Sequence, residues 1–383
     1  MVERKLNIKW LKPQSSQANE PVSRNHLAVS RSLYPPQVLS FKPESWAVLP
    51  AASSLKLFLA EEFLLYSKWS AQAMMMGNSA GMHCIERTDH DMDGMHYEGV
   101  IIRPPSEADS VLLQVTVGCS HNKCTFCGTY KGQRFRFKDE AIIQADLRYA
   151  ARNLSFLKRV FLTDGDALIL PQTRLVRLLT RIREELPWVT RVGLYGNAKS
   201  ILRKTPGELR ELRELGLGIV YLGLESGAEE VLREVRKGVI PERMIEAGRR
   251  IREVGLKLSV TVLLGLAGRE RSLVHARATG AVLSAIDPTY VGVLTLMILP
   301  NTELGRKVEE GQFELLTQTE LMQELRELLS HTHMTRGLFL ANHASNYLPL
   351  KVKMPSGKDR ALQTIDAAIK GVVPLKPEWM RAL

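Results

Sequence analysis

From residue 110 onward, short apolar runs alternate with longer amphipathic stretches, and this alternation limits the possible folds more than any other feature. Each run is rich in β-branched residues and almost uncharged. The six runs cover residues 111–117, 159–163, 191–195, 218–224, 257–265 and 290–296. Strands separated by helical crossovers predict a parallel α/β sheet with right-handed connections. Because the runs are fewer than the eight strands of the usual closed barrel, the sheet either stays open or curls into an incomplete barrel.

The regions on either side of these runs are patterned differently. Residues 1–95 are rich in Pro, Ser and Asn without a regular period, which predicts a loosely structured, partly disordered leader with one helix over 60–76. Residues 96–312 form the predicted barrel core. Residues 313–383 show helices around 320–330 and 363–370 and few strand signals, so they predict a mainly helical cap and substrate region. We expect the folded unit to start near Tyr97 and the leader to be dispensable.

Composition narrows the class of protein. The 383 residues are 45% hydrophobic, enough to bury a substantial core, and a formal charge of +11 favours anionic partners such as nucleotides, phosphates or RNA. The most apolar early stretch, residues 48–69, is interrupted by charged residues, so it does not predict a membrane span. The first residues lack the apolar middle of a secretory signal. We therefore expect a cytoplasmic protein without a membrane partner.

Three of the four cysteines lie within nine residues. Cys119, Cys124 and Cys127 follow the first predicted strand in the pattern C-x4-C-x2-C, where parallel βα folds place their chemistry. Three thiolates can hold three irons of a [4Fe-4S] cluster and leave the fourth iron open to a small molecule. Structural zinc prefers four closed ligands, and only Cys84 or His121 is near enough in sequence to complete that set. Iron–sulfur binding is favoured over zinc and over ordinary buried thiols.

This loop resembles that of the radical S-adenosylmethionine (SAM) enzymes, and Phe126 matches the aromatic residue that precedes their last cysteine. The spacing here is four and two residues instead of the common three and two. The resemblance covers roughly residues 97–301 and lies near the oxygen-independent coproporphyrinogen oxidase and tRNA-modifying branches. It implies a partial (β/α)6 barrel of the radical SAM type, a [4Fe-4S] cluster, reductive cleavage of SAM, and an external one-electron reductant such as a flavodoxin or ferredoxin. It leaves the substrate unknown.

The resemblance also implies roles for residues at the ends of the second and third strands. Asp164, Gly165 and Asp166 are similar to the turn that receives the methionine amino group of SAM, because an ammonium needs acceptors. After the third strand, Asn197 and Ser200 are uncharged hydrogen-bonding candidates for the cofactor. Each could equally be a helix cap.

Further matches follow the fourth and fifth strands. Glu225 ends an apolar strand and resembles the residue that accepts hydrogen bonds from the ribose of SAM. Arg236 and Lys237 are candidates for the SAM carboxylate, or equally for a solvated helix end. Gly265 resembles part of the turn that contacts adenine, where a small residue permits close backbone approach.

Two segments bear on the substrate. Residues 341–351 contain His343, a candidate acid or base, and Tyr347, although a loop histidine is often structural. Residues 129–138 interleave aromatic and basic side chains, which is typical of RNA contact or of an ordinary packed strand edge. Two alternative functions therefore stay open beside the radical SAM enzyme: a zinc-stabilised RNA-binding module, and an iron–sulfur electron carrier without SAM chemistry.

Overall fold

The computed structural model describes residues 94–382. The predictions made for the leader, including the helix over 60–76 and the place of Cys84, lie outside the described residues. The described residues belong to one compact unit.

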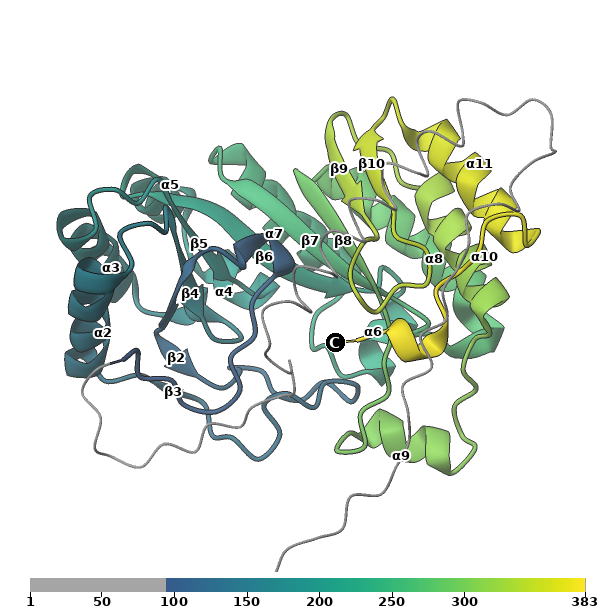
Figure 1. The fold of residues 1–383 in the computed structure, drawn as a ribbon, viewed down its shortest axis with the longest axis horizontal. Coiled ribbons are helices and arrows are strands. Elements are labelled where there is room, and N and C mark those ends of the chain that lie inside the picture. Colours follow the sequence, from purple (N-terminus) through teal and green to yellow (C-terminus); the bar gives the residue numbers. More distant parts are fainter. Residues whose placement is uncertain (1–93, 383) are drawn as a thin grey trace, which may run out of the picture. The chain divides into compact units, whose positions relative to one another are not determined.

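An eight-stranded sheet forms the centre of the described unit, with the order β1-β4-β5-β6-β7-β8-β9-β10 (Figure 1). The six predicted runs are its first six strands, and they pair in parallel. These are β1 (Val111–Gln114), β4 (Arg159–Thr163), β5 (Arg191–Tyr195), β6 (Leu217–Glu225), β7 (Lys257–Leu264) and β8 (Tyr290–Thr295). Because β1 and β10 end the order without pairing to each other, the sheet is an incomplete barrel. The α/β prediction is confirmed.

Amphipathic helices connect the parallel strands and cover the outer face of the sheet. They are α2 (Glu140–Asn153), α3 (Gln172–Glu185), α4 (Ala198–Arg203), α5 (Pro206–Glu214), α6 (Glu229–Glu234), α7 (Pro241–Glu253) and α8 (Gly268–Ile286). Apolar residues of these helices other than α6 join Val160 and Leu162 of β4 in the main core, whereas Phe161 between them belongs to a separate cluster with Ile219 and Tyr221. This alternation of side chains along a strand separates the outer, helix-covered face from the inner face of the barrel. Two short 3-10 helices, η1 (Pro105–Glu107) and η2 (Ala167–Ile169), complete this part.

The C-terminal region differs in part from the predicted cap. Helices prevail there as expected, but two strands extend the sheet: β9 pairs in parallel with β8, and β10 pairs antiparallel with β9. Its elements are α9 (Glu303–Glu309), α10 (Gln318–Ser330), β9 (Gly337–Leu340), β10 (Lys351–Met354), α11 (Lys358–Ile369) and η3 (Glu378–Met380). The mainly helical character is confirmed, and the two strands escaped notice in the sequence because runs of four residues give almost no periodic signal and their pairing depends on tertiary packing.

The first described residues are tied into this core. The backbone N–H of His96 donates to Asp146 Oδ1 at 2.8 Å, and the buried Lys138 ammonium lies 3.0 Å from the other oxygen of the same carboxylate. The side chain of Gln114 exchanges two hydrogen bonds of 2.9 Å with the backbone of Glu98. These contacts attach residues 94–98 to α2 and β1. The domain boundary near residue 95 stays a prediction.

Candidate functional site

The cysteine loop lies at the carboxyl edge of the parallel sheet. It follows β2 (Thr116–Val117), which pairs with β3 (Arg136–Phe137) in a separate two-stranded sheet. The loop residue Thr125 donates through its N–H to Val235 O at 3.0 Å and accepts from Leu304 N at 2.9 Å. Asn301 donates to Gly128 O at 2.9 Å. These bonds join the loop after the first strand to segments beyond β6 and β8, so it reaches across the mouth of the barrel.

The three cysteines are free and partly buried. Burial raises the pKa of the Cys124 thiol to about 11, while the nearby Lys237 ammonium acts to lower it. In residues 94–382, no set of three His, Cys, Asp or Glu side chains is arranged to hold a single metal ion. A [4Fe-4S] cluster takes one sulfur ligand per iron and does not need its three thiolates to meet at one point, so the donor set present here fits that cluster.

Gly165 gives the loop room. A Cβ at this position would lie 3.0 Å from Cys119 Cβ and 3.0 Å from the Tyr130 ring, which is closer than side chains normally approach. Glycine therefore lets the turn after β4 pack directly against the first cysteine.

The segment of residues 129–138, which follows the cysteine loop, is hydrogen-bonded to the backbone of the loop. Lys131 donates to the carbonyl oxygens of Cys124 at 3.0 Å and of Asn122 at 3.3 Å, and the Asn122 amide donates to Tyr130 O at 2.7 Å. Tyr130 is only 3% exposed, and Lys138 is buried against Asp146. Phe137 is instead 40% exposed, so the segment is packed only in part, and RNA contact stays a prediction.

Asp164 fixes the start of the loop. Its buried carboxylate accepts hydrogen bonds from Gln114 Nε2 at 2.9 Å, from Gly118 N at 3.3 Å and from Tyr130 OH at 3.2 Å. Burial raises its pKa to about 6, although these donors act in the opposite direction. The carboxylate therefore connects β1, the residue before Cys119, and the segment that follows the loop.

Asp166 is surrounded more completely. It accepts from Ser120 Oγ at 2.7 Å, Ser200 Oγ at 2.6 Å, Asn197 Nδ2 at 2.7 Å and Asn197 N at 3.1 Å. Burial raises its pKa. Asn197 also caps α4 by accepting from Ser200 N at 2.9 Å, so the capping interpretation holds for this residue. Protein donors occupy both aspartates, which anchor the loop; their role as acceptors for a cofactor stays a prediction.

The end of β6 carries a buried ion pair. Glu225 adopts a positive φ of 63°, and its carboxylate lies 2.9 Å from the Lys237 ammonium, with both side chains about seven-eighths buried. Burial acts to lower the pKa of Lys237, but the Glu225 carboxylate together with the Cys124 and Cys119 sulfurs outweighs it, and the net shift is upward. Arg236 instead points outward, is 60% exposed, and pairs with Glu303 of α9 at 2.7 and 3.2 Å. The structure thus separates the two predicted cations: Lys237 lies inside the site and Arg236 on its rim.

Phe126 packs the cysteine loop against the ends of β7 and β8. It packs against a small apolar cluster whose members are Val231, Val235, Leu263, Leu266, Ala267 and Leu296. Beside this cluster, Gly265 has a φ of 82°, and its N–H donates to Glu324 Oε1 at 2.8 Å. Sequence reasoning missed Glu324, which comes from α10. Its signal is a glutamate within the apolar stripe of that helix, where it is fully buried among leucines.

The two predicted catalytic residues lie in the loop between β9 and β10. His343 Nδ1 is 2.9 Å from Ser345 Oγ, which accepts from Thr295 N at the end of β8, and burial lowers the histidine pKa. The Tyr347 hydroxyl accepts from Arg381 at 2.7 Å and donates to Glu378. Both residues are near the carboxyl edge of the sheet, but Tyr347 fastens the C-terminal turn. Their catalytic roles stay predictions.

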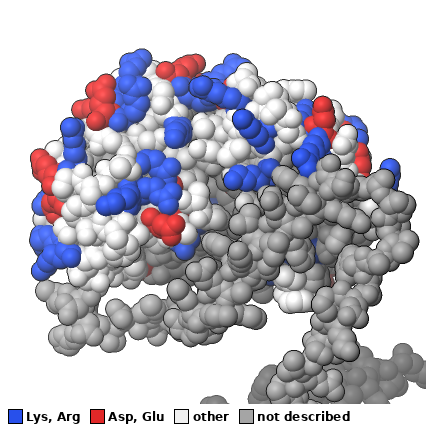
Figure 2. Space-filling model, turned by 45° about the horizontal axis from the view of Figure 1, so that its top comes forward, with Lys and Arg blue, Asp and Glu red and all other residues white. Residues whose placement is uncertain are grey.

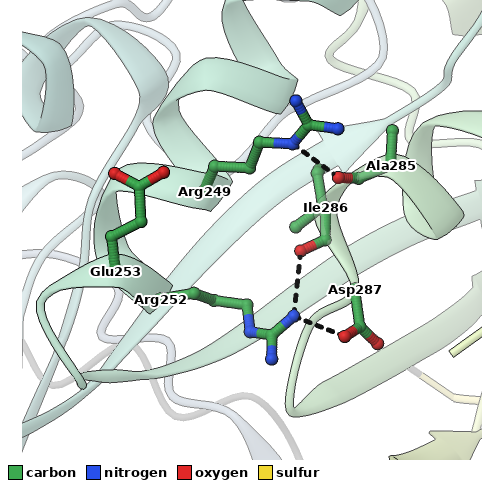
Figure 3. A pocket seen from close by; sticks show the side chains of 6 residues that line it. All are labelled: Arg249, Arg252, Glu253, Ala285, Ile286 and Asp287. Atoms are coloured by element: carbon green, nitrogen blue, oxygen red, sulfur yellow. Dashed lines mark hydrogen bonds and ion pairs between the residues drawn. The ribbon is translucent and has the colours of Figure 1, made fainter. Parts of the chain in front are cut away.

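A separate pocket lies at the opposite edge of the sheet (Figure 3). It sits where α7 and α8 end, and its lining residues are Arg249, Arg252, Glu253, Ala285, Ile286 and Asp287. Arg249 donates to Ala285 O at 2.8 Å and Arg252 to Asp287 at 2.6 Å, as Figure 3 shows. The pocket shares no residue with the cysteine loop or the carboxyl strand ends, so it is not part of the candidate site.

The positive charge is spread over the surface. Figure 2 shows Lys and Arg side chains distributed over one face, with Asp and Glu among them. Several cations of the described residues are paired, as in the contacts of Arg271 with Glu234 at 2.6 Å and of Arg181 with Glu185 at 3.0 Å. Within residues 94–382, no helix is both long and apolar enough to cross a bilayer.

Comparisons with known proteins agree with this geometry. Residues 113–273 match the Radical SAM superfamily. A provisionally named methylthiotransferase of Methanocaldococcus jannaschii is 21% identical over 251 residues, covering 60% of this chain and 54% of that protein. The chain spans about half the length of the curated relatives it matches.

Two solved structures are also similar. The radical S-adenosylmethionine methyltransferase TsrM from Kitasatospora setae, with cobalamin and a [4Fe-4S] cluster bound, is 21% identical with a TM-score of 0.44, over 52% of this chain and 39% of that one. Coproporphyrinogen III oxidase from Escherichia coli is 18% identical with a TM-score of 0.45, over 58% and 51%. The family match supports neither the zinc-stabilised module nor the electron carrier.

Proposed function

Because residues 113–273 of this chain match the Radical SAM superfamily, we propose that the protein is an enzyme that holds a [4Fe-4S] cluster on Cys119, Cys124 and Cys127 and cleaves SAM reductively to start radical chemistry. The observation that carries the proposal is the position of the three-cysteine loop, which is anchored across the carboxyl edge of an incomplete parallel barrel. The substrate remains to be identified.

The bound cluster would supply one electron to the SAM sulfonium, giving methionine and a 5′-deoxyadenosyl radical that takes a hydrogen atom from the substrate. The protein has to hold the sulfonium beside the cysteine loop and exclude water and other hydrogen donors. Phe126 and its apolar neighbours exclude water on one side, because they pack the cysteine loop against the ends of β7 and β8.

Lys237 serves the electrostatics of the site. Its ammonium is buried close to the thiols of Cys124 and Cys119 and pairs with Glu225. A cluster held by three thiolates carries negative charge, which is costly to bury without a compensating cation. Lys237 therefore stabilises the loaded loop, and Glu225 orients the ammonium while it offers its carboxylate toward the ribose position.

The remaining roles follow the strand ends. The backbone of the turn around Gly165 receives the methionine end of SAM, Asp164 and Asp166 hold that turn in place, and the turn at Gly265 faces the adenine. His343, near the end of β8, is the acid or base candidate on the substrate side. An external flavodoxin or ferredoxin would provide the electron, and the reaction would take place in the cytoplasm.

Anaerobic reconstitution tests this function. About four irons per chain, deoxyadenosine formed from SAM under reducing conditions, and loss of both in Cys119→Ser, Cys124→Ser or Cys127→Ser are expected. Cys84→Ser is the matched control and should retain the cluster. About one zinc per chain and no iron would instead favour the RNA-binding alternative, and a cluster without deoxyadenosine would favour the electron carrier.

A further inference from the structure

We propose that a buried network of Ser226, His275 and Glu324 positions the two turns that follow β6 and β7, and so makes nucleotide binding depend on helix α10 of the C-terminal region. The inference rests on the proposed function, because these turns are the ones assigned to the ribose and adenine of SAM. It adds positioning residues that lie outside the strand-end motifs.

The direction of each hydrogen bond follows from what each group can do. His275 Nε2 lies 3.1 Å from Leu263 O, which can only accept, so this nitrogen carries the proton. His275 Nδ1 then accepts a hydrogen bond from the Ser226 hydroxyl at 2.8 Å. Ser226 Oγ in turn accepts from Ala228 N at 3.0 Å. These roles are those of a neutral imidazole, and burial, which lowers the pKa of His275 to about 4, favours that form.

Glu324 completes the network from the other side. Its carboxylate accepts from Gly265 N at 2.8 Å and from the Ser272 hydroxyl in the first turn of α8, and it lies 3.5 Å from His275 Nε2. The residue is fully buried and belongs to α10, some sixty positions beyond the turn that it contacts. Helix α10 thus holds the adenine turn through Glu324, which accepts from Gly265 N. Helix α8 holds the end of β7 through His275, which donates to Leu263 O.

A second link joins the turn after β6 to helix α8. Gly227 N donates to Thr279 Oγ1 at 2.8 Å, and the Thr279 hydroxyl donates to His275 O at 2.6 Å. Ser226 and Gly227 directly follow Glu225, the proposed ribose contact. The two nucleotide-binding turns are therefore both fixed to one segment of α8, and a shift of His275 would move them together.

The composition of the network indicates positioning more than stability. A leucine at position 324 would suit the apolar stripe of α10 and would avoid burying a carboxyl group. The carboxylate is instead directed at the amide of Gly265, whose φ of 82° defines the shape of the turn. None of the hydrogen bonds of these three side chains reaches the cysteine loop. Loss of the network should consequently weaken SAM binding and leave cluster loading unchanged.

The test uses the reconstituted full-length protein and measures iron per chain, the dissociation constant for SAM and the unfolding midpoint. Glu324→Ala should weaken SAM binding about tenfold, the effect of losing one buried hydrogen bond, with iron content equal to wild type. Glu324→Gln should restore most of the affinity because its amide oxygen can still accept from Gly265 N. Glu327→Gln, on the same helix but paired with Arg277 at the surface, is the matched control and should bind SAM as wild type does.

Ser226→Ala gives an independent readout if Glu324→Ala does not fold, and it should also weaken SAM binding with iron unchanged. SAM affinity within twofold of wild type in the folded variants would overturn the proposal. A parallel loss of bound iron and SAM affinity in these variants would also overturn it, since the network would then have a general structural role. Failure of the wild-type protein to bind iron or SAM would contradict the proposed function instead, and the two failures are thus distinguishable.

Discussion

Replacing Asp166 by alanine should destabilise the protein strongly, because this one carboxylate accepts from four donors in two segments, the cysteine loop and the start of α4. Ser120, Ser200 and Asn197 supply them at 2.6–3.1 Å, and Asp166 itself is fully buried. A hydrogen bond to a charged group contributes about 1.5–3 kcal/mol, and donors left buried without an acceptor carry their own desolvation cost. The four bonds share one acceptor and are not additive, and the buried charge itself is costly, so we expect a net loss of about 4 kcal/mol.

Urea unfolding followed by circular dichroism, under anaerobic conditions, measures this loss in the free energy of unfolding. Asp166→Asn keeps one acceptor oxygen and should lose less, roughly half as much. Asp109→Ala is the matched control, since its side chain is 86% exposed and its contact with Arg159 is 3.9 Å long; a change within about 0.5 kcal/mol is expected. If Asp166→Ala came within about 1 kcal/mol of wild type, the anchoring role of this carboxylate would be refuted.

Three further outcomes are expected. Burial raises the pKa of Asp164 to about 6, so the folded protein binds this proton more tightly than the unfolded chain does. The free energy of unfolding should therefore fall as the pH rises from about 4 to 6. In Asp164→Asn, which cannot titrate, the urea midpoint should fall less over this pH range. Gly265→Ala strains a backbone with φ of 82° and should weaken SAM binding in a direct titration while iron stays at the wild-type level; unchanged affinity would contradict the assigned turn. Lys237→Met should lower the iron bound on reconstitution, whereas Arg236→Met, on the exposed rim, should not; equal iron in both variants would argue against the electrostatic role of Lys237.

The sequence predicted the local features of the site well. Six strands and their order followed from apolar runs of the right length, since strand and helix periods are properties of neighbouring residues. The place of the cysteine loop at the carboxyl edge followed in turn, because a loop after a parallel strand has no other position. The sequence also allowed Asn197 to be a helix cap, a role that depends only on the residues just after it.

Tertiary structure decided what these residues contact. The folded chain places Asp164 and Asp166 under the cysteine loop among donors from separate segments, contacts that the sequence did not indicate, and their role toward a cofactor stays a prediction. Arg236 and Lys237 are adjacent in sequence, but only Lys237 faces the site.

By itself, then, the sequence determined the parallel sheet and the three thiols at its edge, since both are written in short-range pattern and spacing. Only the folded chain decided that β9 and β10 extend the sheet, and that Glu324 reaches Gly265 from far along the chain. Contacts of this kind arise when packed helices and strands bring distant side chains together, and local propensity carries no information about which partners will meet.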